Sequence, residues 1–269
     1  MSLDPVSANW RLVSFNIQFG VAAAWRRKRD ALAAHLHDLQ ADVLCLQEVT
    51  PAGFAWLRTE LGDPPAVGVG REDGVSRGEH TPIFVLNPHW TLRDGGTFWF
   101  SDSPDRPSRS WGAAHPRICS WARIDRGKAT EASLTIFNLH LDHRSRRART
   151  ASVALLHTQI DRLAPTGHVV ICGDFNLRPH DPLYPRLLDG NRAFADAALE
   201  AKDTANSTVA VTPTWLGWSR FGWGRARIDY VLSDQNLPVH RYNVGDHRHK
   251  GLPVSDHRPV VVDFGREKN

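Results

Sequence analysis

The sequence predicts a mixed α/β fold with two β-rich halves and helices on the outside. Short apolar, β-branched runs alternate with stretches of helical periodicity, first over residues 11–100 and again over residues 117–265. The chain has 269 residues, of which 41% are hydrophobic, and this is enough to bury a large core. No linker-like segment divides the sequence, so we expect a single domain over residues 8–266.

Four of the apolar runs end in polar residues of the kinds that bind metals or transfer protons. A run such as Val169-Val170-Ile171-Cys172 is typical of a buried strand. The runs and the polar residues that follow them are 12–15 with Asn16, 43–46 with Gln47 and Glu48, 134–139 with His140, and 169–172 with Asp174 and Asn176. Strand ends that share one edge of a sheet bring such groups together, so these segments predict one common site.

Three stretches beside these runs have apolar residues at helical spacing. The apolar positions are Trp25, Leu32, Leu36 and Leu39 in the first, Phe54, Leu57 and Leu61 in the second, and Leu156, Ile160 and Leu163 in the third. The third helix should stop before Pro165, because proline does not fit a helix interior. Residues 62–82 and 101–116 are rich in Gly, Pro, Ser and charged residues, which predicts loops.

The charge and the cysteine content narrow the class of protein. A net charge of +4 and an isoelectric point of about 9.2 favour an anionic partner.

The three cysteines are odd in number and two lie in apolar runs, which predicts reduced core thiols. No run approaches the length of a membrane span, and the amino end lacks the pattern of a secretory signal, so we expect a cytoplasmic protein.

Six short motifs follow one another along the chain: Ser14-Phe15-Asn16, Leu46-Gln47-Glu48, Asn138-Leu139-His140, Gly173-Asp174-Phe175-Asn176, Arg227-Ile228-Asp229-Tyr230 and Ser255-Asp256-His257. In this order they resemble the endonuclease/exonuclease/phosphatase superfamily. That superfamily includes pancreatic-type deoxyribonucleases, exonuclease III-type repair enzymes, deadenylases, inositol-polyphosphate 5-phosphatases and neutral sphingomyelinases. The resemblance implies a four-layer α/β/β/α sandwich of two stacked, mostly antiparallel sheets with outer helices, which periodicity alone does not specify.

Glu48 is the leading candidate for a metal ligand. Cleavage of a phosphodiester needs a hard cation near the phosphate oxygens, and carboxylate oxygens suit Mg²⁺ or Mn²⁺. The sequence has no Cys/His cluster with zinc spacing that would compete. The resemblance implies that Asn16 and Asp256 lie on the same metal-binding rim. The alternative interpretation of Glu48 is a capped strand end.

Asp174 is the candidate for activating the attacking water. The resemblance implies that Asp174 orients or deprotonates this water, while the Asn176 amide holds water or phosphate in line. The alternative is that Asp174-Phe175-Asn176 is an ordinary turn after a strand, since Asp and Asn are common turn residues.

Two histidines are predicted to flank the phosphate. The resemblance gives this place to His140 and His257, which would donate hydrogen bonds to the pentavalent transition state. It also supplies Asp229 as the orienting carboxylate of His257, and Glu79 as that of His140. Carboxylate partners favour the protonated form of imidazole, so both rings are expected to carry a charge.

Basic and aromatic residues near the motifs are candidates for substrate contact. Arg117, at the start of a strand, touches phosphate or only supports the cleft. Arg149 belongs to an arginine cluster behind the His140 strand, which clamps phosphate or is solvated. Trp218 and Trp223 lie in a Gly-rich segment, where they can stack on bases, plug the sheet edge or touch lipid.

Together these residues predict a divalent-metal-dependent phosphodiesterase. The basic charge balance and the aromatic segment favour a nuclease, endo- or exonuclease, which we expect to be a monomer acting on nucleic acid. The alternative is a phosphoesterase of small-molecule or lipid phosphates, of the inositol phosphate or sphingomyelin type, because the same catalytic groups serve both. A binding module with a decayed site is disfavoured, because the set of motif residues is intact.

Overall fold

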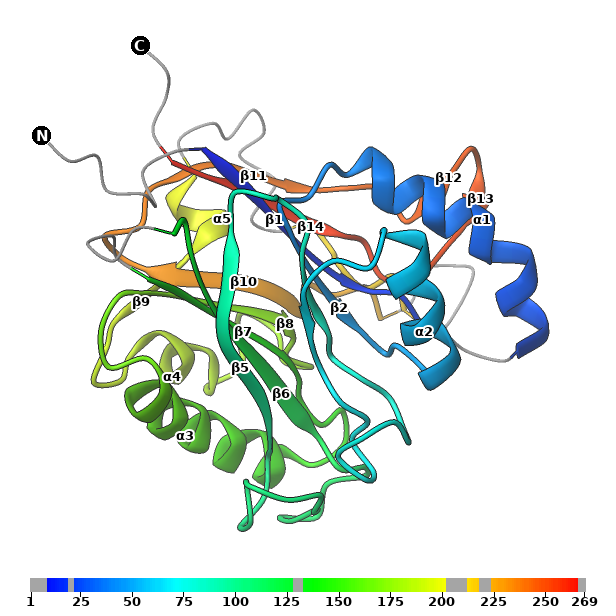
Figure 1. The fold of residues 1–269 in the computed structure, drawn as a ribbon. Helices are drawn as coiled ribbons and strands as arrows, with labels where there is room; N and C mark the ends of the chain where they lie inside the picture. The colour runs from blue at the N-terminus through cyan, green and yellow to red at the C-terminus, as the bar shows by residue number, and fades with distance from the viewer. Residues whose placement is uncertain (1–8, 19–21, 128–132, 202–211, 218–223, 266–269) are drawn as a thin grey trace, which may run out of the picture.

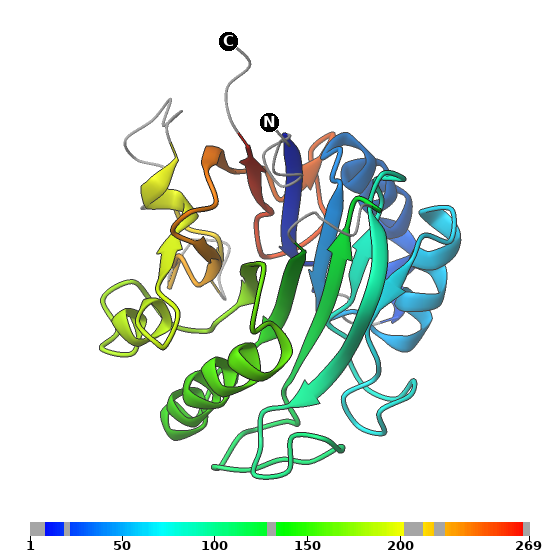
Figure 2. The same cartoon turned by 60° about the vertical axis from the view of Figure 1, so that its left-hand side comes forward.

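The computed structural model of the protein describes residues 9–18, 22–127, 133–201, 212–217 and 224–265. The helices are α1 (Ala22–Asp38), α2 (Pro51–Glu60), α3 (Arg146–Leu163), α4 (Tyr184–Leu188) and α5 (Ala197–Glu200). α1 and α2 cover one sheet, and α3 and α4 cover the other, which confirms the four-layer sandwich (Figure 1). The two helical layers lie on opposite sides of the sheets in the turned view (Figure 2).

The described strands form two sheets of six strands each, and a separate hairpin of β12 (Arg248–His249) and β13 (Leu252–Pro253). In spatial order, the strands of the first sheet are β11 (Val239–Val244), β14 (Val260–Phe264), β1 (Trp10–Asn16), β2 (Val43–Gln47), β4 (Ile83–Val85) and β3 (Ala66–Val67). Those of the second are β5 (Thr91–Trp99), β6 (Ile118–Asp125), β7 (Leu134–His140), β8 (His168–Asp174), β10 (Asp229–Asp234) and β9 (Phe194–Asp196). No helix in the described part of the chain is long and apolar enough to cross a membrane.

One parallel pair in each sheet brings the predicted strand ends together. β1 and β2 are parallel, with Asn16 opposite Gln47, and β7 and β8 are parallel, with His140 opposite Asp174. β10 runs antiparallel to β8, which sets Asp229 opposite Asp174. Since the carboxyl ends of parallel strands meet at one edge, polar side chains from distant segments become neighbours there.

β8 explains why these strands appear as unbroken apolar runs. Val170 and Cys172 face the apolar layer between the sheets, whereas Val169 and Ile171 belong to the layer that packs against α3. A strand that is buried on both faces needs apolar residues at every position. All three cysteines are buried and free, as predicted. α3 ends at Leu163, before the proline that was expected to stop it.

A buried amide on β7 joins the two sheets. Asn138 donates from Nδ2 to the carbonyl oxygens of Leu46 and Pro82, each at 2.9 Å, and its Oδ1 accepts a bond of 2.7 Å from Gln47 Nε2. Gln47 Nε2 also lies 3.2 Å from Ser14 Oγ on β1. Since Asn138 belongs to the second sheet and its partners to the first, this network ties the sheets together close to the edge where His140 ends β7.

Replacing Asn138 with leucine should lower the free energy of unfolding by about 3 kcal/mol, because three buried hydrogen bonds of about 1 kcal/mol each are lost. Urea denaturation gives the value. Thr135→Val on the same strand is the control: Thr135 Oγ1 is buried and has no hydrogen-bond partner among the described residues. The control should change stability by less than about 0.5 kcal/mol or raise it. Equal losses in both variants would contradict the bridging role.

Candidate active site

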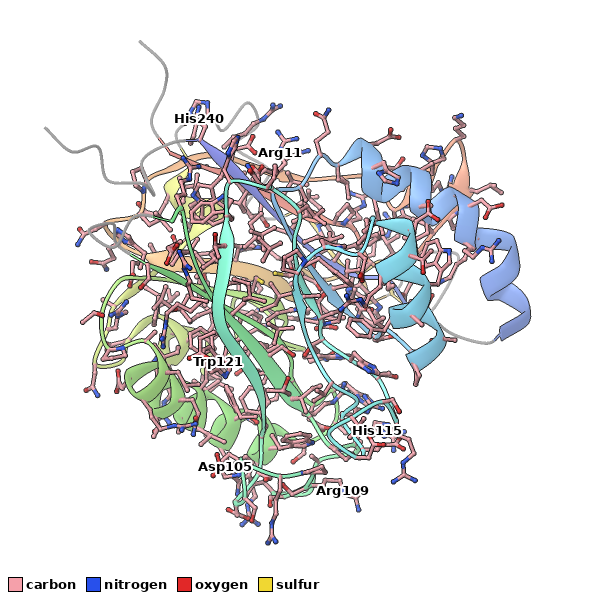
Figure 3. The ribbon with its side chains drawn as sticks, in the orientation of Figure 1. Arg11, Asp105, Arg109, His115, Trp121 and His240 are labelled. Atoms are coloured by element: carbon pink, nitrogen blue, oxygen red, sulfur yellow. The ribbon has the colours of Figure 1, made fainter. Side chains whose placement is uncertain are left out.

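A cleft of about 760 Å³ opens at the edge where these strands end. His115, which lines it, lies at the loop-covered end of the molecule, far from Arg11 and His240 at the other end of the sheets (Figure 3). The predicted site residues in the wall of the cleft are Glu48, Glu79, Arg117, His140, Arg149, Asp174, Asn176, Asp256 and His257. Segments separated by as much as two hundred residues therefore form one site.

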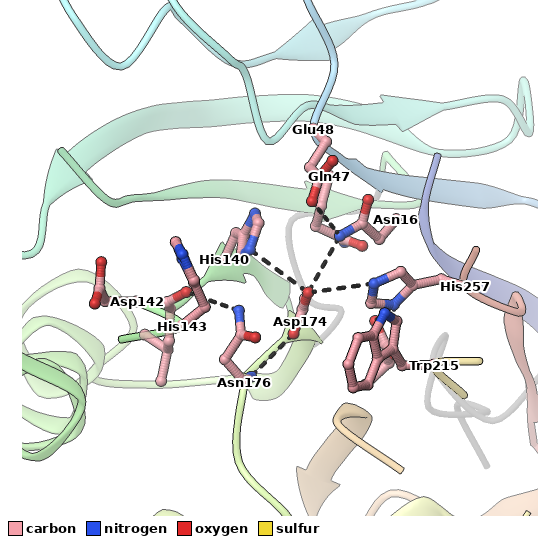
Figure 4. A network of polar contacts seen from close by, with 12 residues as sticks. Asn16, Gln47, Glu48, His140, Asp142, His143, Asp174, Asn176, Trp215 and His257 are labelled. Carbon is pink, nitrogen blue, oxygen red and sulfur yellow. Dashed lines mark hydrogen bonds and ion pairs between the residues drawn. The ribbon is translucent and has the colours of Figure 1, made fainter. Parts of the chain in front are cut away.

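Asp174 lies at the centre of a polar network (Figure 4). Its Oδ2 accepts a hydrogen bond of 3.1 Å from Asn16 Nδ2 and lies 3.5 Å from His140 Nε2 and 3.8 Å from His257 Nε2. Its Oδ1 accepts a bond of 2.9 Å from the backbone N–H of Asn176. One carboxylate therefore contacts an amide and two imidazoles, contributed by both sheets.

The backbone around this network adopts conformations that L-residues rarely use. Gly173 has φ of +134°, and a Cβ there would lie 2.0 Å from the carbonyl oxygen of Leu139, so only glycine allows β7 and β8 to approach at this point. Asn176 and Glu48 have φ of +49° and +57°, in the left-handed region. Both follow a strand end, where such turns redirect the side chain, and strained residues of this kind cluster at functional sites.

His257 is paired with Asp229, as predicted. The ring Nδ1 lies 3.0 Å from Asp229 Oδ2. Burial lowers the pKa of His257, but the charge of Asp229, its hydrogen bond to the ring and the charges of Asp174 and Asp256 together raise it more, and the result is about 10. Thr214 Oγ1 accepts a 3.0 Å bond from the N–H of Asp229, and Ser255 Oγ accepts one from the N–H of His257. The imidazole is therefore a positioned cation at neutral pH.

His140 has different surroundings, and the predictions of a Glu79 partner and of a charged ring are wrong. Glu79 forms its ion pair with Arg71, and among the described residues it makes no hydrogen bond or ion pair with His140. Burial, together with the positive charges of Arg117 and Arg71, holds the pKa of His140 well below the ordinary value. The ring is therefore neutral at neutral pH. The ring is neutral because it is buried and because the charges of two arginines from other segments act on it, and motif spacing does not reveal these arginines.

Glu48 and Asp256 have the properties of ligands for a hard divalent cation. Burial and the charge of Glu79 raise the pKa of Glu48. Asp256 Oδ1 is buried without a hydrogen-bond partner among the described residues, while its Oδ2 accepts a bond of 3.3 Å from Trp215 Nε1. Asn16 Nδ2 donates to Glu48 Oε1 at 3.0 Å and so orients that carboxylate. Buried acceptors without donors fit the oxygen ligation that Mg²⁺ or Mn²⁺ prefers.

Asp174, Asp229 and His257 form a second group, whose possible ligand atoms lie within 4.8 Å of one another. Within this group His257 Nδ1 is already paired with Asp229, and His257 Nε2 lies 3.8 Å from Asp174 Oδ2. The same pairing suits the group to proton transfer and hydrogen-bond donation. Two carboxylates that could hold a cation, Glu48 and Asp256, therefore lie in the same cleft as a group that could transfer protons.

The predicted substrate-contact residues have mixed outcomes. Arg117 lines the cleft but is only 5% exposed, with Nε 3.8 Å from Asp142 Oδ2. Arg149 also lines the cleft, and its Nη1 donates to the carbonyl oxygen of Asp142 at 2.8 Å. Trp218 and Trp223 lie outside the described residues, so the predictions about them stay predictions.

The structure adds residues that the motifs did not single out. Thr214 and Trp215 hold Asp229 and Asp256 in place through a hydroxyl and an indole N–H. Their only sequence signal is a position just before the Arg227 motif, in the aromatic segment. Further cationic residues of the cleft wall are Arg71, Arg146, Arg178 and, when protonated, His115, His143 and His180.

Comparisons with known proteins agree with this geometry. The model of the Endonuclease/Exonuclease/phosphatase family matches residues 13–257. A crystal structure of an endonuclease/exonuclease/phosphatase from Bacteroides vulgatus is 26% identical, with a TM-score of 0.86, and the match covers 97% of this chain and 100% of that chain.

Two further structures are similar over nearly the whole chain. A mannosyl-6-phosphatase of Bacteroides thetaiotaomicron is 25% identical, with a TM-score of 0.79, over 96% of this chain and 100% of that chain. Truncated TDP2 of Caenorhabditis elegans is 18% identical, with a TM-score of 0.72, over 96% and 98%. The likeness to TDP2 shows a shared fold.

Asp229→Asn should lower the pKa of His257 from about 10 to near the ordinary histidine value of about 6.5, because burial is then opposed only by the weaker effects of Asp174 and Asp256. At pH 8 the ring would be neutral in the variant and charged in the unmodified protein. Titration of the ring ¹⁵N chemical shifts in metal-free protein measures this. Asp125→Asn, at the far end of β6 from the cleft, is the control and should leave the titration unchanged. An unaltered His257 titration in Asp229→Asn would refute the pairing.

Proposed function

The chain belongs to the endonuclease/exonuclease/phosphatase family, and from that premise we propose that it is a divalent-metal-dependent phosphodiesterase that cleaves nucleic acid. Hydrolysis of phosphoester bonds is the common activity of this family. The observation that carries the proposal is the Asp174 carboxylate, set between His140 and His257 in an arginine-lined cleft. Each of these groups has a distinct task in hydrolysis.

Asp174 has the protonation behaviour of a general base. Burial and the nearby charge of Asp229 raise the pKa of Asp174 to about 7, and a base is most effective when its pKa lies near the working pH. Oδ1 accepts the N–H of Asn176, and Oδ2, which lies between His140 and His257, takes a proton from the attacking water. The water oxygen bonds to phosphorus as the bond to the leaving oxygen breaks.

The two histidines bind the reacting phosphate in different ways. His257 is charged and donates from Nε2 to a phosphate oxygen, where a fixed positive donor stabilises the negative charge of the transition state. His140 is neutral and contributes one hydrogen bond without adding charge. Glu48 and Asp256 would hold the divalent cation, which when bound neutralises charge on the phosphate oxygens. Asn16 positions both Glu48 and Asp174 through one amide nitrogen.

A nucleic-acid substrate is supported by the charge of the chain and of the cleft. The net charge is +4, and five arginines lie among the described residues of the cleft wall. A positive cleft attracts a polyanion and holds its backbone phosphates.

The second candidate is a phosphatase that acts on a phosphorylated small molecule. The likeness to a mannosyl-6-phosphatase, at 25% identity over nearly the whole chain, favours this candidate. A cleft of about 760 Å³ is within the size range of small-molecule sites, which run from about 300 to 1,000 Å³.

Purified protein with Mg²⁺ or Mn²⁺ should hydrolyse at least one class in a panel of single- and double-stranded DNA, RNA, bis(p-nitrophenyl) phosphate, sugar phosphates and inositol phosphates. Cleavage of DNA or RNA supports the nuclease proposal, and hydrolysis of sugar or inositol phosphates alone supports the second candidate. Asp174→Asn should lower kcat by about 10²- to 10⁴-fold, because a general base contributes that much. Unchanged turnover in this variant would mean that Asp174 is not the base, or that a contaminant is active.

Removal of divalent cations with EDTA should abolish hydrolysis, and Mg²⁺ or Mn²⁺ should restore it. Glu48→Gln should weaken Mn²⁺ binding by about tenfold or more, because an amide oxygen carries no charge for the cation. Isothermal titration with Mn²⁺ measures this without relying on activity. The control is Glu60→Gln on α2, where the glutamate pairs with His37 outside the cleft. Equal Mn²⁺ affinity in the Glu48 variant and the unmodified protein would rule out this ligand.

A further inference from the structure

We infer that the arginine-rich side of the cleft is a second phosphate subsite, which binds a phosphate that is not cleaved. The favoured substrate then carries one phosphate at Asp174 and another on Arg146 and Arg149. This inference rests on the proposed phosphoester hydrolysis and names the substrates that it favours.

The cleft has an acidic side and a basic side. Glu48 and Asp256 lie on the acidic side, next to His257. The basic side adjoins His140: the charges of Arg117 and Arg71 act on its pKa, and Figure 4 shows Asp142 and His143 on the His140 side of Asp174, away from His257. The arginines of the cleft wall are Arg71, Arg117, Arg146, Arg149 and Arg178. The reacting phosphate at Asp174 therefore has a basic surface beside it.

Only part of this positive charge is neutralised by the protein. Arg71 pairs with Glu79, and Arg117 Nε lies 3.8 Å from Asp142 Oδ2. Asp181 also lines the cleft, and its Oδ1 accepts the N–H of Leu183. Among the described residues, the cleft arginines without an ion pair to a carboxylate are Arg146, Arg149 and Arg178. These side chains leave an excess of positive charge at the surface of the cleft.

The start of α3 adds to this excess. The first turn of the helix contains Arg146 and Arg149 and no acidic residue. A helix N-terminus carries partial positive charge, so cations in the first turn are unfavourable unless an anion is near. The carboxylate of Asp142 accepts hydrogen bonds from the N–H groups of Arg144 and Ser145 just before the helix, but it also forms an ion pair with Arg117. A phosphate group would relieve the remaining repulsion.

Buried donors on the same side point independently to a missing acceptor. Arg117 lines the cleft with a side chain that is only 5% exposed, and its Nε has no hydrogen-bond acceptor among the described residues. The Nε of Arg149 is also buried and also has no hydrogen-bond acceptor among the described residues. Unpaired buried donors are destabilising, and the guanidinium fork matches the oxygens of a phosphate. Arg149 is already held by its bond to the Asp142 carbonyl, so the donor is positioned before a ligand arrives.

Two kinds of substrate supply a second phosphate. A nucleic-acid strand offers the phosphate next to the one that is cleaved, and a small molecule offers a second phosphate on the same skeleton. Both present the same phosphoryl oxygens to the arginines, so binding has to be compared within matched pairs of each kind.

Binding of matched ligands to Asp174→Asn protein tests the subsite without catalysis. The pairs are thymidine 3′,5′-bisphosphate with thymidine 5′-monophosphate, and glucose 1,6-bisphosphate with glucose 6-phosphate, measured by isothermal titration with Mg²⁺. The bisphosphate of at least one pair should bind about tenfold more tightly or better. Tighter binding of the nucleotide bisphosphate than of the monophosphate identifies the ligand of the subsite as a nucleic-acid phosphate. Tighter binding of the bisphosphate in the sugar pair alone identifies it as the second phosphate of a small molecule.

Adding Arg146→Gln and Arg149→Gln to that protein should reduce the advantage to near unity. Arg147→Gln is the matched control, because Arg147 lies on the same turn of α3 but does not line the cleft, and it should keep the advantage. Equal affinity for mono- and bisphosphates in both pairs, or an advantage that survives the double substitution, would overturn the subsite. Neither result depends on hydrolysis, so an inactive protein would challenge the proposed function alone.

Discussion

The relative position of the two sheets is the constraint on which the site depends, and the buried amide of Asn138 sets it near the strand ends. Asp174 comes from the second sheet, whereas Asn16 and Glu48 come from the first. The bonds of 3.0 and 3.1 Å from Asn16 Nδ2 to these two carboxylates therefore require the sheets to keep one register. Apolar packing between sheets is non-directional, but a buried amide with three partners has a defined geometry.

Because the site is buried, the charged neighbours of each histidine determine whether its pKa is raised or lowered. His140 and His257 are both buried and both lie within 4 Å of Asp174 Oδ2, yet the pKa of one is lowered and that of the other is raised. The positive charges of Arg117 and Arg71 act on the first ring, and Asp229 contacts the second. Because water does not screen these charges, neighbours contributed by other segments of the chain determine which ring is the cation. Asp174 is shifted toward neutrality in the same environment, which suits it to accept a proton.

Much of this arrangement was predictable from the sequence, and the limits have a physical cause. Local periodicity predicted the strand ends and helix stripes, and the resemblance carried by the six motifs implied the four layers and placed Asp174 and Glu48 in one site. The partner of Glu79 depends on a loop conformation that places Arg71 beside it, which no local pattern encodes. The sequence showed Asn138 as part of a motif but did not predict its role, because that role depends on which residues of the other sheet face it. Pairing across layers is a property of the packed structure.

The charge distribution of the cleft connects the metal site with the substrate. Glu48 and Asp256 have no ion pair with a cationic side chain among the described residues, and Arg146 and Arg149 have none with a carboxylate. Charges of one sign that lie close together in a poorly solvated cleft repel each other, so each side is destabilising when considered alone. A cation on the carboxylates and a phosphate on the arginines would neutralise both sides. Ligands of opposite charge that bind in one cleft also attract each other, so each should strengthen the binding of the other.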